Sequence, residues 1–442
     1  MKTPTVGIVS LGCPRNMVDS EVMLGALKKA GYTIKMSAEN CDIALINTCA
    51  FIEDAKQEAI DVILQAAKLK QEGKIKFLIV AGCLAQRYHK ALEKKIPEVD
   101  AFLGTSDFDK ITDAVSTVLK NKKATYVSEP TKIYTHKFPR LSLTPSYSTY
   151  IKIAEGCNNR CSYCAIYKIR GNYRSRPMDS IIKEIESITA KSEISELNII
   201  AQDTTSYGSD IYGKYKLTDL LKKIAALKKA HWIRLLYTHP RHFTDELMDV
   251  IKNENAVCKY IDLPIQHISD TILEKMNRRT TKVQIESLIN KIRKRIPGVV
   301  LRTSVIVGFP GETDAEFIQL LDFIKEVKFE RLGAFIYSRE EKTPAYNYKK
   351  QITGSIKRQR LDAIMKTQQE ISEDVNKRWL GKTLEVLIDE KDKDSFYIAR
   401  SQYDAPEVDG VVYVKAKQAK PGEFLKVKIT DTMEYDLTGE PV

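Results

Sequence analysis

Strand-like and helix-like segments alternate six times along residues 147–372. Short apolar runs rich in β-branched residues predict the strands, and apolar residues at helical spacing lie between them, as at 180–190 and 315–327. The strand candidates are 150–154, 197–203, 233–237, 260–266, 300–309 and 331–338. Such alternation is typical of a parallel sheet covered by helices. Six units are too few for a closed eight-unit barrel, so we expect an open, partial (βα)6 barrel.

The N-terminal segment, residues 1–125, shows the same alternation on a smaller scale. Strand candidates at 5–11, 42–48 and 76–82 are separated by helical patterns at 20–32 and 53–73. This order predicts an α/β domain with a doubly wound parallel sheet. The following polar, Pro-containing stretch, 126–146, is interpreted as a linker.

The C-terminal segment, residues 375–442, has a different pattern. It contains short strand-like runs separated by turn residues: TLEVLIDE, SFYIARS, GVVYVKA and EFLKVKITD. Closely spaced short strands are typical of a small antiparallel β-barrel. We therefore expect three domains, which also suits the length of 442 residues.

Composition limits the class of protein. The chain is 43% hydrophobic and 29% charged, which is ordinary for a soluble globular protein. It has no apolar run long enough to span a membrane, and its first residues lack the order of a signal peptide. A cytoplasmic protein is therefore expected, in which eight cysteines are thiols or metal ligands rather than disulfides. The net charge of +12 favours a polyanionic partner such as RNA or a ribosome.

Three cysteines, Cys157, Cys161 and Cys164, lie within eight residues directly after the first barrel strand. A closed zinc site needs four ligands, usually as two separated pairs, and no fourth cysteine or histidine is near. Three thiolates can hold three irons of a four-iron cube and leave the fourth iron open for another ligand. The spacing therefore predicts an iron–sulfur cluster; a zinc loop or reduced surface thiols are the alternatives.

Three further cysteines, Cys13, Cys49 and Cys83, each follow a strand of the N-terminal segment. Parallel strands end at one edge of their sheet, so these thiols are expected on a common rim, where α/β folds build sites. We predict a second three-thiolate cluster there; the alternative is that they are small buried residues. Cys41 and Cys258 belong to neither triplet and are interpreted as packing residues.

The motif C-x3-C-x2-C, with Tyr163 before its last cysteine, resembles the signature of the radical S-adenosylmethionine superfamily. With the second triplet and the terminal barrel, the whole chain resembles the methylthiotransferase branch, in which that barrel is a TRAM domain. The resemblance implies two 4Fe–4S clusters and S-adenosylmethionine as cofactors. It also implies replacement of C–H by C–S–CH3, and a reduced electron donor such as flavodoxin or ferredoxin.

Members of this branch modify either an aspartate, at its β-carbon, of small-subunit ribosomal protein S-twelve or an adenosine of tRNA. The runs SLGCPRNMVDSE (10–21), IIAQDTTSYG (199–208), YSREEKTPAY (337–346) and SQYDAPEVDG (401–410) resemble the ribosomal-protein members. The tRNA members differ after the first cysteine and tend to have Gln-Asn in the second run. The ribosomal protein, free or on the small subunit, is thus the favoured substrate, and tRNA is the alternative.

Charge supports the same choice. Residues 374–442 contain 11 Lys and Arg but 14 Asp and Glu, although the whole chain is basic. A barrel that grips RNA should be basic, because phosphate neutralisation dominates affinity. We expect Asp404, Glu407 and Asp409 to face a basic protein substrate.

The remaining candidates lie in the cysteine motif, at the ends of barrel strands or in KMNRR (275–279). By resemblance, a ring of such residues holds S-adenosylmethionine: Tyr163, Gln202, Asp203, Gln266, His267, Arg278 and Gly308. Gly308 would allow a ligand to approach the backbone closely. Two other function classes stay open at this point. One is a radical enzyme whose N-terminal cluster only transfers electrons, and the other is a non-catalytic RNA- or ribosome-binding protein with zinc thiolates.

Overall fold

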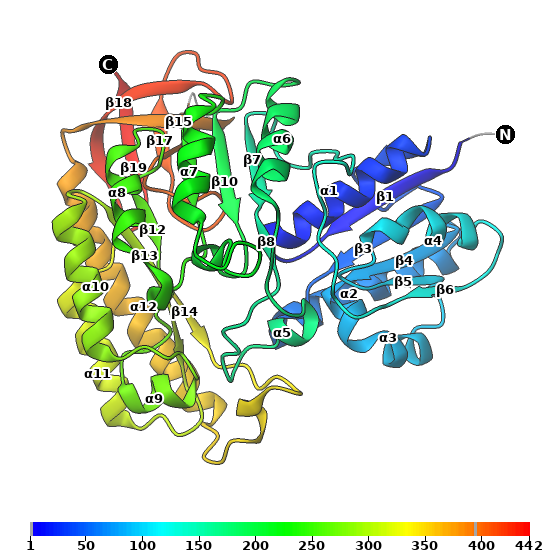
Figure 1. Ribbon diagram of the computed structural model, residues 1–442, viewed down its shortest axis with the longest axis horizontal. Coiled ribbons are helices and arrows are strands. Elements are labelled where there is room, and N and C mark those ends of the chain that lie inside the picture. The colour runs from blue at the N-terminus through cyan, green and yellow to red at the C-terminus, as the bar shows by residue number, and fades with distance from the viewer. Residues whose placement is uncertain (1–2, 393–395) are drawn as a thin grey trace.

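The computed structural model of the protein describes residues 3–392 and 396–442, which form three domains (Figure 1). Met1 and Lys2, at the start of the predicted N-terminal domain, lie outside the described residues. So does Ser395, the first residue of the predicted strand SFYIARS. None of the described helices is both long enough and apolar enough to cross a membrane.

The N-terminal domain is a six-stranded, wholly parallel sheet with strand order β2-β1-β3-β4-β5-β6. Its strands are β1 (Thr5–Ser10), β2 (Thr33–Lys35), β3 (Ile43–Thr48), β4 (Phe77–Gly82), β5 (Ala101–Leu103) and β6 (Ala124–Tyr126). Its helices are α1 (Pro14–Lys29), α2 (Glu53–Gln71), α3 (Cys83–Lys95) and α4 (Ile111–Val118). Residues of α1 and α4 share one buried cluster, and residues of α2 and α3 share another. Helices therefore cover both faces, which confirms the doubly wound sheet.

Helix α1 begins six residues before the predicted position. Pro14 occupies its first turn, where the missing N–H costs nothing and the fixed φ favours the helix. The run PRNMVDSE is polar, but Asn16, Asp19 and Glu21 are all buried. The apolar pattern used for the prediction therefore missed the first turn and a half.

The central domain contains six parallel strands in the order β7-β10-β11 and β12-β13-β14. An isolated parallel bridge between Ile233 and Val257 links the two halves. The strands are β7 (Ser148–Lys152), β10 (Glu196–Ile200), β11 (Trp232–Leu235), β12 (Tyr260–Asp262), β13 (Val300–Val307) and β14 (Arg331–Ile336). A short pair, β8 (Ala154–Glu155) and β9 (Arg174–Ser175), brackets the cysteine loop. This arrangement confirms the partial (βα)6 barrel.

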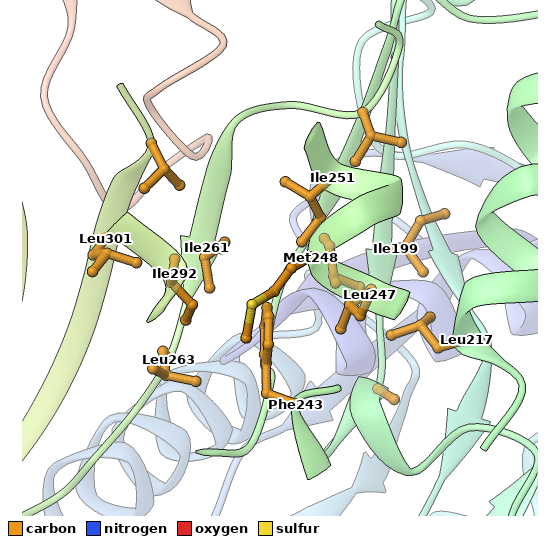
Figure 2. Packing of buried hydrophobic residues seen from close by; sticks show 14 of the residues in the cluster. Ile199, Leu217, Phe243, Leu247, Met248, Ile251, Ile261, Leu263, Ile292 and Leu301 are labelled. Carbon is orange, nitrogen blue, oxygen red and sulfur yellow. The ribbon is translucent and has the colours of Figure 1, made fainter. Parts of the chain in front are cut away.

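Helices pack on the outside of these strands and bury one continuous apolar core. Figure 2 shows Met248 and Leu247 of α8 against Ile199 of β10 and Ile261 of β12. The helices are α6 (Met178–Thr189), α7 (Leu217–Ala226), α8 (Asp245–Asn253), α9 (Asp270–Lys275), α10 (Lys282–Arg295), α11 (Asp314–Val327) and α12 (Gly354–Asn376). The short helix α5 (Ile166–Ile169) packs instead against the N-terminal domain, where Ile169 joins the cluster of α2 and α3. The core of the partial barrel fixes the strands, and the strands in turn fix the loops at their ends.

The C-terminal domain is a closed barrel with strand order β15-β16-β17-β19-β18. Its strands are β15 (Thr383–Lys391), β16 (Phe396–Ser401), β17 (Val412–Lys415), β18 (Phe424–Thr432) and β19 (Leu437–Pro441). The pairs are antiparallel as expected, except that β17 and β19 run parallel. The strand patterns gave no sign of that pair, because it depends on how the chain crosses between distant strands.

The C-terminal barrel closes the end of the partial barrel where its strands begin. Arg400 of β16 is paired with Glu196, the first residue of β10, at 3.0 Å. Glu196 is also paired with Arg234 of β11 at 2.8 Å. The terminal barrel therefore lies at the opposite end from the loops that follow the strands.

The N-terminal domain contacts the other end of the partial barrel. Arg15 of α1 donates a hydrogen bond to the carbonyl of Ala201, directly after β10, at 3.1 Å. Arg87 of α3 is paired with Glu340, beyond β14, at 2.8 Å. The rim that carries Cys13 thus faces the rim that carries the cysteine loop.

The predicted linker packs between the two domains. The side chain of Tyr134 is buried. Arg140 pairs with Glu21 of α1 at 2.5 Å and with Glu184 of α6 at 3.0 Å. The segment helps to fix the relative position of the two domains.

Candidate functional site

The N-terminal cysteines follow three adjacent strands. Cys13 precedes α1 after β1, Cys49 follows β3, and Cys83 begins α3 directly after β4. Strand β3 pairs with both β1 and β4, so the three strand ends are neighbours on one edge. Gly12, at φ +87°, lies so close that a Cβ there would be 2.6 Å from the Cβ of Cys49. The predicted convergence on one rim is present.

The thiols of Cys13 and Cys49 have pKa values shifted in opposite directions. Burial alone would raise the pKa of the Cys13 thiol, but the guanidinium groups of Arg15 and Arg170 bring that pKa below its usual value. Burial and the neighbouring Cys83 and Cys13 raise the pKa of Cys49 to about 12. Because metal binding requires thiolates, cluster assembly must remove protons from these thiols.

The second triplet lies on the loop between β8 and α5. Gly156, at φ +76°, precedes it, and a Cβ there would be 2.1 Å from the carbonyl oxygen of Asn172. The Ser162 hydroxyl donates to the carbonyl of Lys275 at 2.6 Å, and its N–H donates to that of Met276 at 2.9 Å. The cysteine loop is therefore held by the end of α9, far away in sequence.

The second triplet is also buried among few charges. Burial raises the pKa of Cys157 to about 12. Arg278 approaches the sulfur of Cys161 with its Nη1 at 3.6 Å and donates from Nη2 to the carbonyl of Pro264. Burial and the adjacent Cys161 raise the pKa of Tyr163 well above its usual value, so that ring stays neutral. Arg278 is the cation best placed to stabilise thiolates here.

Arg170, just after α5, connects the two triplets. Its Nη2 lies 3.5 Å from the sulfur of Cys83 and 3.1 Å from Asn16 Oδ1. Its Nη1 donates to Asp19 at 2.5 Å and to Glu155 at 3.1 Å. A segment that follows the second triplet thereby holds a residue of the first.

The surroundings of the cysteine triplets can be compared with what a metal ion or a cluster needs. Within residues 3–392 and 396–442, no three His, Cys, Asp or Glu side chains lie close enough together to hold one metal ion. A cube of four irons and four sulfides is wider than one ion, so its thiolates stand farther apart than those around zinc. Arginine N–H groups near Cys13, Cys83 and Cys161 suit cluster ligands, whose sulfurs accept hydrogen bonds.

Two of the predicted rim residues keep polar atoms unsatisfied within the described structure. Gln202 donates from Nε2 to Glu155 at 2.6 Å, while its buried Oε1 has no partner. His267 accepts the N–H of Ser269 at Nδ1, and its buried Nε2 has none. Gln266 has a left-handed backbone, at φ +73°, between its bonds to β13. Gln202 and His267 thus each keep one buried polar atom whose hydrogen-bonding capacity is unused.

Asp203, another of the predicted rim residues, has several protein partners. Its carboxylate accepts hydrogen bonds from Asn159 in the cysteine loop at 2.8 Å and from the hydroxyl of Ser206 at 2.7 Å. It also accepts from Thr205 and contacts Nδ1 of His242 at 3.0 Å. The carboxylate therefore helps to hold the cysteine loop.

Gly308, also predicted at this rim, lies against a lysine side chain. Its φ of +71° is left-handed, and a Cβ there would be 2.3 Å from Cγ of Lys357 on α12. The side chain of Lys357 therefore occupies the open side of this glycine. Packing of α12 is sufficient reason for glycine at this position.

Comparison with known proteins places these features in a family. Residues 5–104 match the uncharacterized protein family UPF0004, residues 151–324 the radical SAM superfamily, and residues 380–442 the TRAM domain. A relative from Clostridioides difficile (strain 630), named ribosomal protein uS12 methylthiotransferase RimO, is 48% identical over 98% of both chains. One of the same name from Desulforamulus reducens is 49% identical over 99% of both.

The chain belongs to the RimO methylthiotransferase family. It is a radical S-adenosylmethionine transferase, and the family's cofactors are S-adenosylmethionine and two 4Fe–4S clusters.

Solved structures agree with this methylthiotransferase in fold. A radical S-adenosylmethionine methyltransferase from Kitasatospora setae, TsrM, solved with cobalamin and a 4Fe–4S cluster, has a TM-score of 0.57 at 16% identity. The match covers 78% of this chain and 77% of that one. The cobalamin-dependent radical enzyme OxsB has a TM-score of 0.51 at 14% identity and matches 83% of this chain and 56% of its own. These likenesses concern the fold alone.

The structure corrects the predicted partner surface of the methylthiotransferase. Asp404 is buried and paired with Arg331 at 2.7 Å. Asp409 accepts the Tyr260 hydroxyl at 2.6 Å and lies 3.3 Å from Arg302. Both carboxylates thus dock the terminal barrel on the partial barrel, and only Glu407 is exposed. The motif was read as a surface because its arginine partners lie more than 70 residues away.

Sequence reasoning missed Arg15 and Arg170, which surround the first triplet. Arg15 follows Cys13 by two residues, and that proximity was the one available signal. Arg170 lies 87 residues from Cys83, so nothing in the sequence connects them. Cys41 and Cys258 are buried packing residues, as predicted.

Proposed function

We propose that this chain attaches a methylthio group to the β-carbon of an aspartate in small-subunit ribosomal protein S-twelve. In this proposal Cys157, Cys161 and Cys164 hold the cluster that binds S-adenosylmethionine at its open iron. Residues Cys13, Cys49 and Cys83 hold the second cluster, which serves sulfur transfer. The terminal barrel, at the other end of the strands, has a supporting role.

One observation carries the proposal: the two triplets face each other across a single domain interface. Arg15 reaches from the first triplet to the end of β10, and Arg170 reaches from the second triplet to Cys83. A substrate held at this interface would meet both centres without a large domain movement. The name and near-complete coverage of the relatives support the same reaction.

When bound, the clusters would supply hydrogen abstraction through S-adenosylmethionine on one side and sulfur on the other. The chain's own residues orient and shield these groups. Asp203 and Ser162 hold the cysteine loop, Arg278 lies beside Cys161, and Gln202 presents a free buried oxygen. The S-adenosylmethionine contacts proposed here are Tyr163, Gln202, Gln266, His267 and Arg278.

The proposal also covers the electron donor, the cellular location and the substrate. The electron donor is a reduced protein such as flavodoxin or ferredoxin, and the enzyme acts in the cytoplasm. The substrate is a basic ribosomal protein, free or on the small subunit. The excess of acidic residues in the terminal domain suits a protein substrate better than tRNA.

Product mass tests this assignment. Ribosomal protein S-twelve and bulk tRNA would be isolated from cells with the intact gene and from cells with Cys157, Cys161 and Cys164 changed to Ala. The ribosomal protein should carry a methylthio group only in the first strain, and the tRNA should be identical in both. A methylthio group that disappears from tRNA adenosine instead would make this a tRNA enzyme.

A further inference from the structure

The side chain of Arg15 connects the first cysteine triplet to the partial barrel. Its Nε lies 3.4 Å from the sulfur of Cys13, and its Nη1 donates to the carbonyl of Ala201 at 3.1 Å. Its guanidinium carbon lies 4.2 Å from the centre of the ring of Tyr237, the second residue after β11. The positive charge also opposes the effect of burial on the pKa of Cys164 in the second triplet. Arg15 therefore joins the first triplet to the ends of β10 and β11, in the mouth of the partial barrel.

The charge of Arg15 lacks a carboxylate partner within the described residues. Six of the seven buried arginines form ion pairs with Asp or Glu: Arg170, Arg176, Arg234, Arg331, Arg360 and Arg400. The exception is Arg278, at the other triplet. Arg15, which is half-buried, likewise has none, and its Nη2 donates no hydrogen bond there. Arg15 and Arg278 thus differ from the other six arginines in having no carboxylate partner within the described residues.

A guanidinium with a free amino group is suited to hold a carboxylate, because it offers parallel N–H donors and keeps its charge at any working pH. Tyr237 and Ala201 fix the guanidinium plane, so little side-chain entropy remains to be lost on binding. The carboxylate that must enter this space is that of the target aspartate, whose neighbouring carbon receives the sulfur. If the only role of Arg15 were to contact Cys13, its side chain would not need to extend to Ala201 at the end of β10.

We propose that Nη2 of Arg15 binds the side-chain carboxylate of the substrate aspartate and so places its β-carbon between the two centres. This assignment rests on the proposed function and adds a residue that selects aspartate. It predicts that recognition of the carboxylate, separately from recognition of the rest of the ribosomal protein, depends on Arg15.

The test is a two-by-two binding experiment with cluster-loaded enzyme, S-adenosylmethionine and no reductant, so that no turnover occurs. Calorimetry would give Kd for ribosomal protein S-twelve and for its version with asparagine at the target position. Wild type should prefer aspartate by roughly 10- to 100-fold, the range for a charged hydrogen bond. Arg15→Gln should bring that ratio to about 1, and Arg15→Lys should keep part of it, because lysine retains the charge without the fork.

Two controls separate this assignment from other effects. Arg358→Gln alters an exposed arginine on α12 and should keep the wild-type ratio. A general loss of affinity in Arg15→Gln, for example through its contact with Cys13, would weaken both substrates equally and cancel in the ratio. An aspartate preference that persists in Arg15→Gln, or is absent in wild type, would overturn the role of Arg15. Failure of wild type to methylthiolate the ribosomal protein once reductant is added would instead overturn the proposed function.

Discussion

Four buried ionic side chains fix the position of one cysteine triplet relative to the other. Arg170 and Lys152 share Asp19 of α1 and Glu155 of β8, so two cations and two carboxylates from both domains form one network. Each charge is far from water, and removal of one partner would leave another uncompensated, typically at about 3–5 kcal/mol. The network gives little net stability over apolar packing, but it fixes where α1, and therefore Cys13, lies.

His267 is a second residue whose charge state matters. Burial, with a smaller contribution from the nearby charge of Arg360, lowers its pKa to about 3. The folded protein therefore keeps this imidazole neutral at pH values where the unfolded chain protonates it. Stability from this group is complete above the unfolded value near 6.5 and is lost as the pH falls toward 3.

We predict that His267→Asn will flatten the acid side of the stability profile. Asparagine can still accept the N–H of Ser269 but does not titrate. Between pH 6.5 and pH 4, the free energy of unfolding of wild type should fall more steeply than that of the variant, by up to about 1.4 kcal/mol per pH unit. Urea titrations at several pH values measure both slopes. Parallel profiles would mean that His267 is not held neutral.

At the scale of single elements, the turn from β1 to α1 controls the first triplet. Gly12 has a left-handed backbone and faces Cys49, whereas Gly73, at the end of α2, has a similar φ of +74° but open space around it. The two positions thus share backbone strain on substitution by alanine and differ only in what the new methyl group meets.

Gly12→Ala should therefore displace Cys49 and remove the N-terminal cluster. Iron analysis after anaerobic reconstitution should give about eight irons in wild type and about four in the variant, because each cube holds four. The matched variant Gly73→Ala should keep about eight. Full iron content in Gly12→Ala would show that Cys49 is not a ligand at its observed position.

The elements also show which parts of the fold were predictable from sequence. Strands β1, β3 and β4 were predictable because each has six residues, most of them apolar in β3 and β4 and half of them β-branched apolar residues in β1, and their parallel order placed three cysteines on one rim. Strands β2, β5 and β6 have three residues each, too few for a periodic pattern. The contacts of Arg15 with Ala201, of Arg170 with Cys83 and of Asp404 with Arg331 could not be predicted, because each joins segments 70 or more residues apart.

At the scale of the whole molecule, the two outer domains contact different parts of the partial barrel. The N-terminal domain lies beside β7 and contacts the strand ends near the cysteine loop, and the terminal barrel covers the strand beginnings (Figure 1). Arg400, Glu196 and Arg234 form the centre of the second interface, and all three are buried. The cysteine triplets therefore lie away from the ion pairs that hold the C-terminal domain in place.

Glu196→Gln should loosen the terminal barrel, because it leaves the charges of Arg234 and Arg400 without a shared carboxylate. We expect the free energy of unfolding to fall by about 3 kcal/mol. The control Glu193→Gln, at an exposed neighbouring position, should change it by less than about 0.5 kcal/mol. Urea denaturation measures both. Equal, small effects would show that the ion pairs contribute nothing to docking.

The central claim is that the two cysteine triplets perform different parts of one reaction at one interface. One mass-spectrometry assay tests it. Each enzyme is mixed with ribosomal protein S-twelve, S-adenosylmethionine and a reductant, and both products are measured in the same sample. The variant with Cys13, Cys49 and Cys83 changed to Ala should still form 5′-deoxyadenosine but no methylthiolated protein. The variant with Cys157, Cys161 and Cys164 changed to Ala should form neither, and wild type should form both. Methylthiolated protein from the first variant at the wild-type rate would contradict the claim.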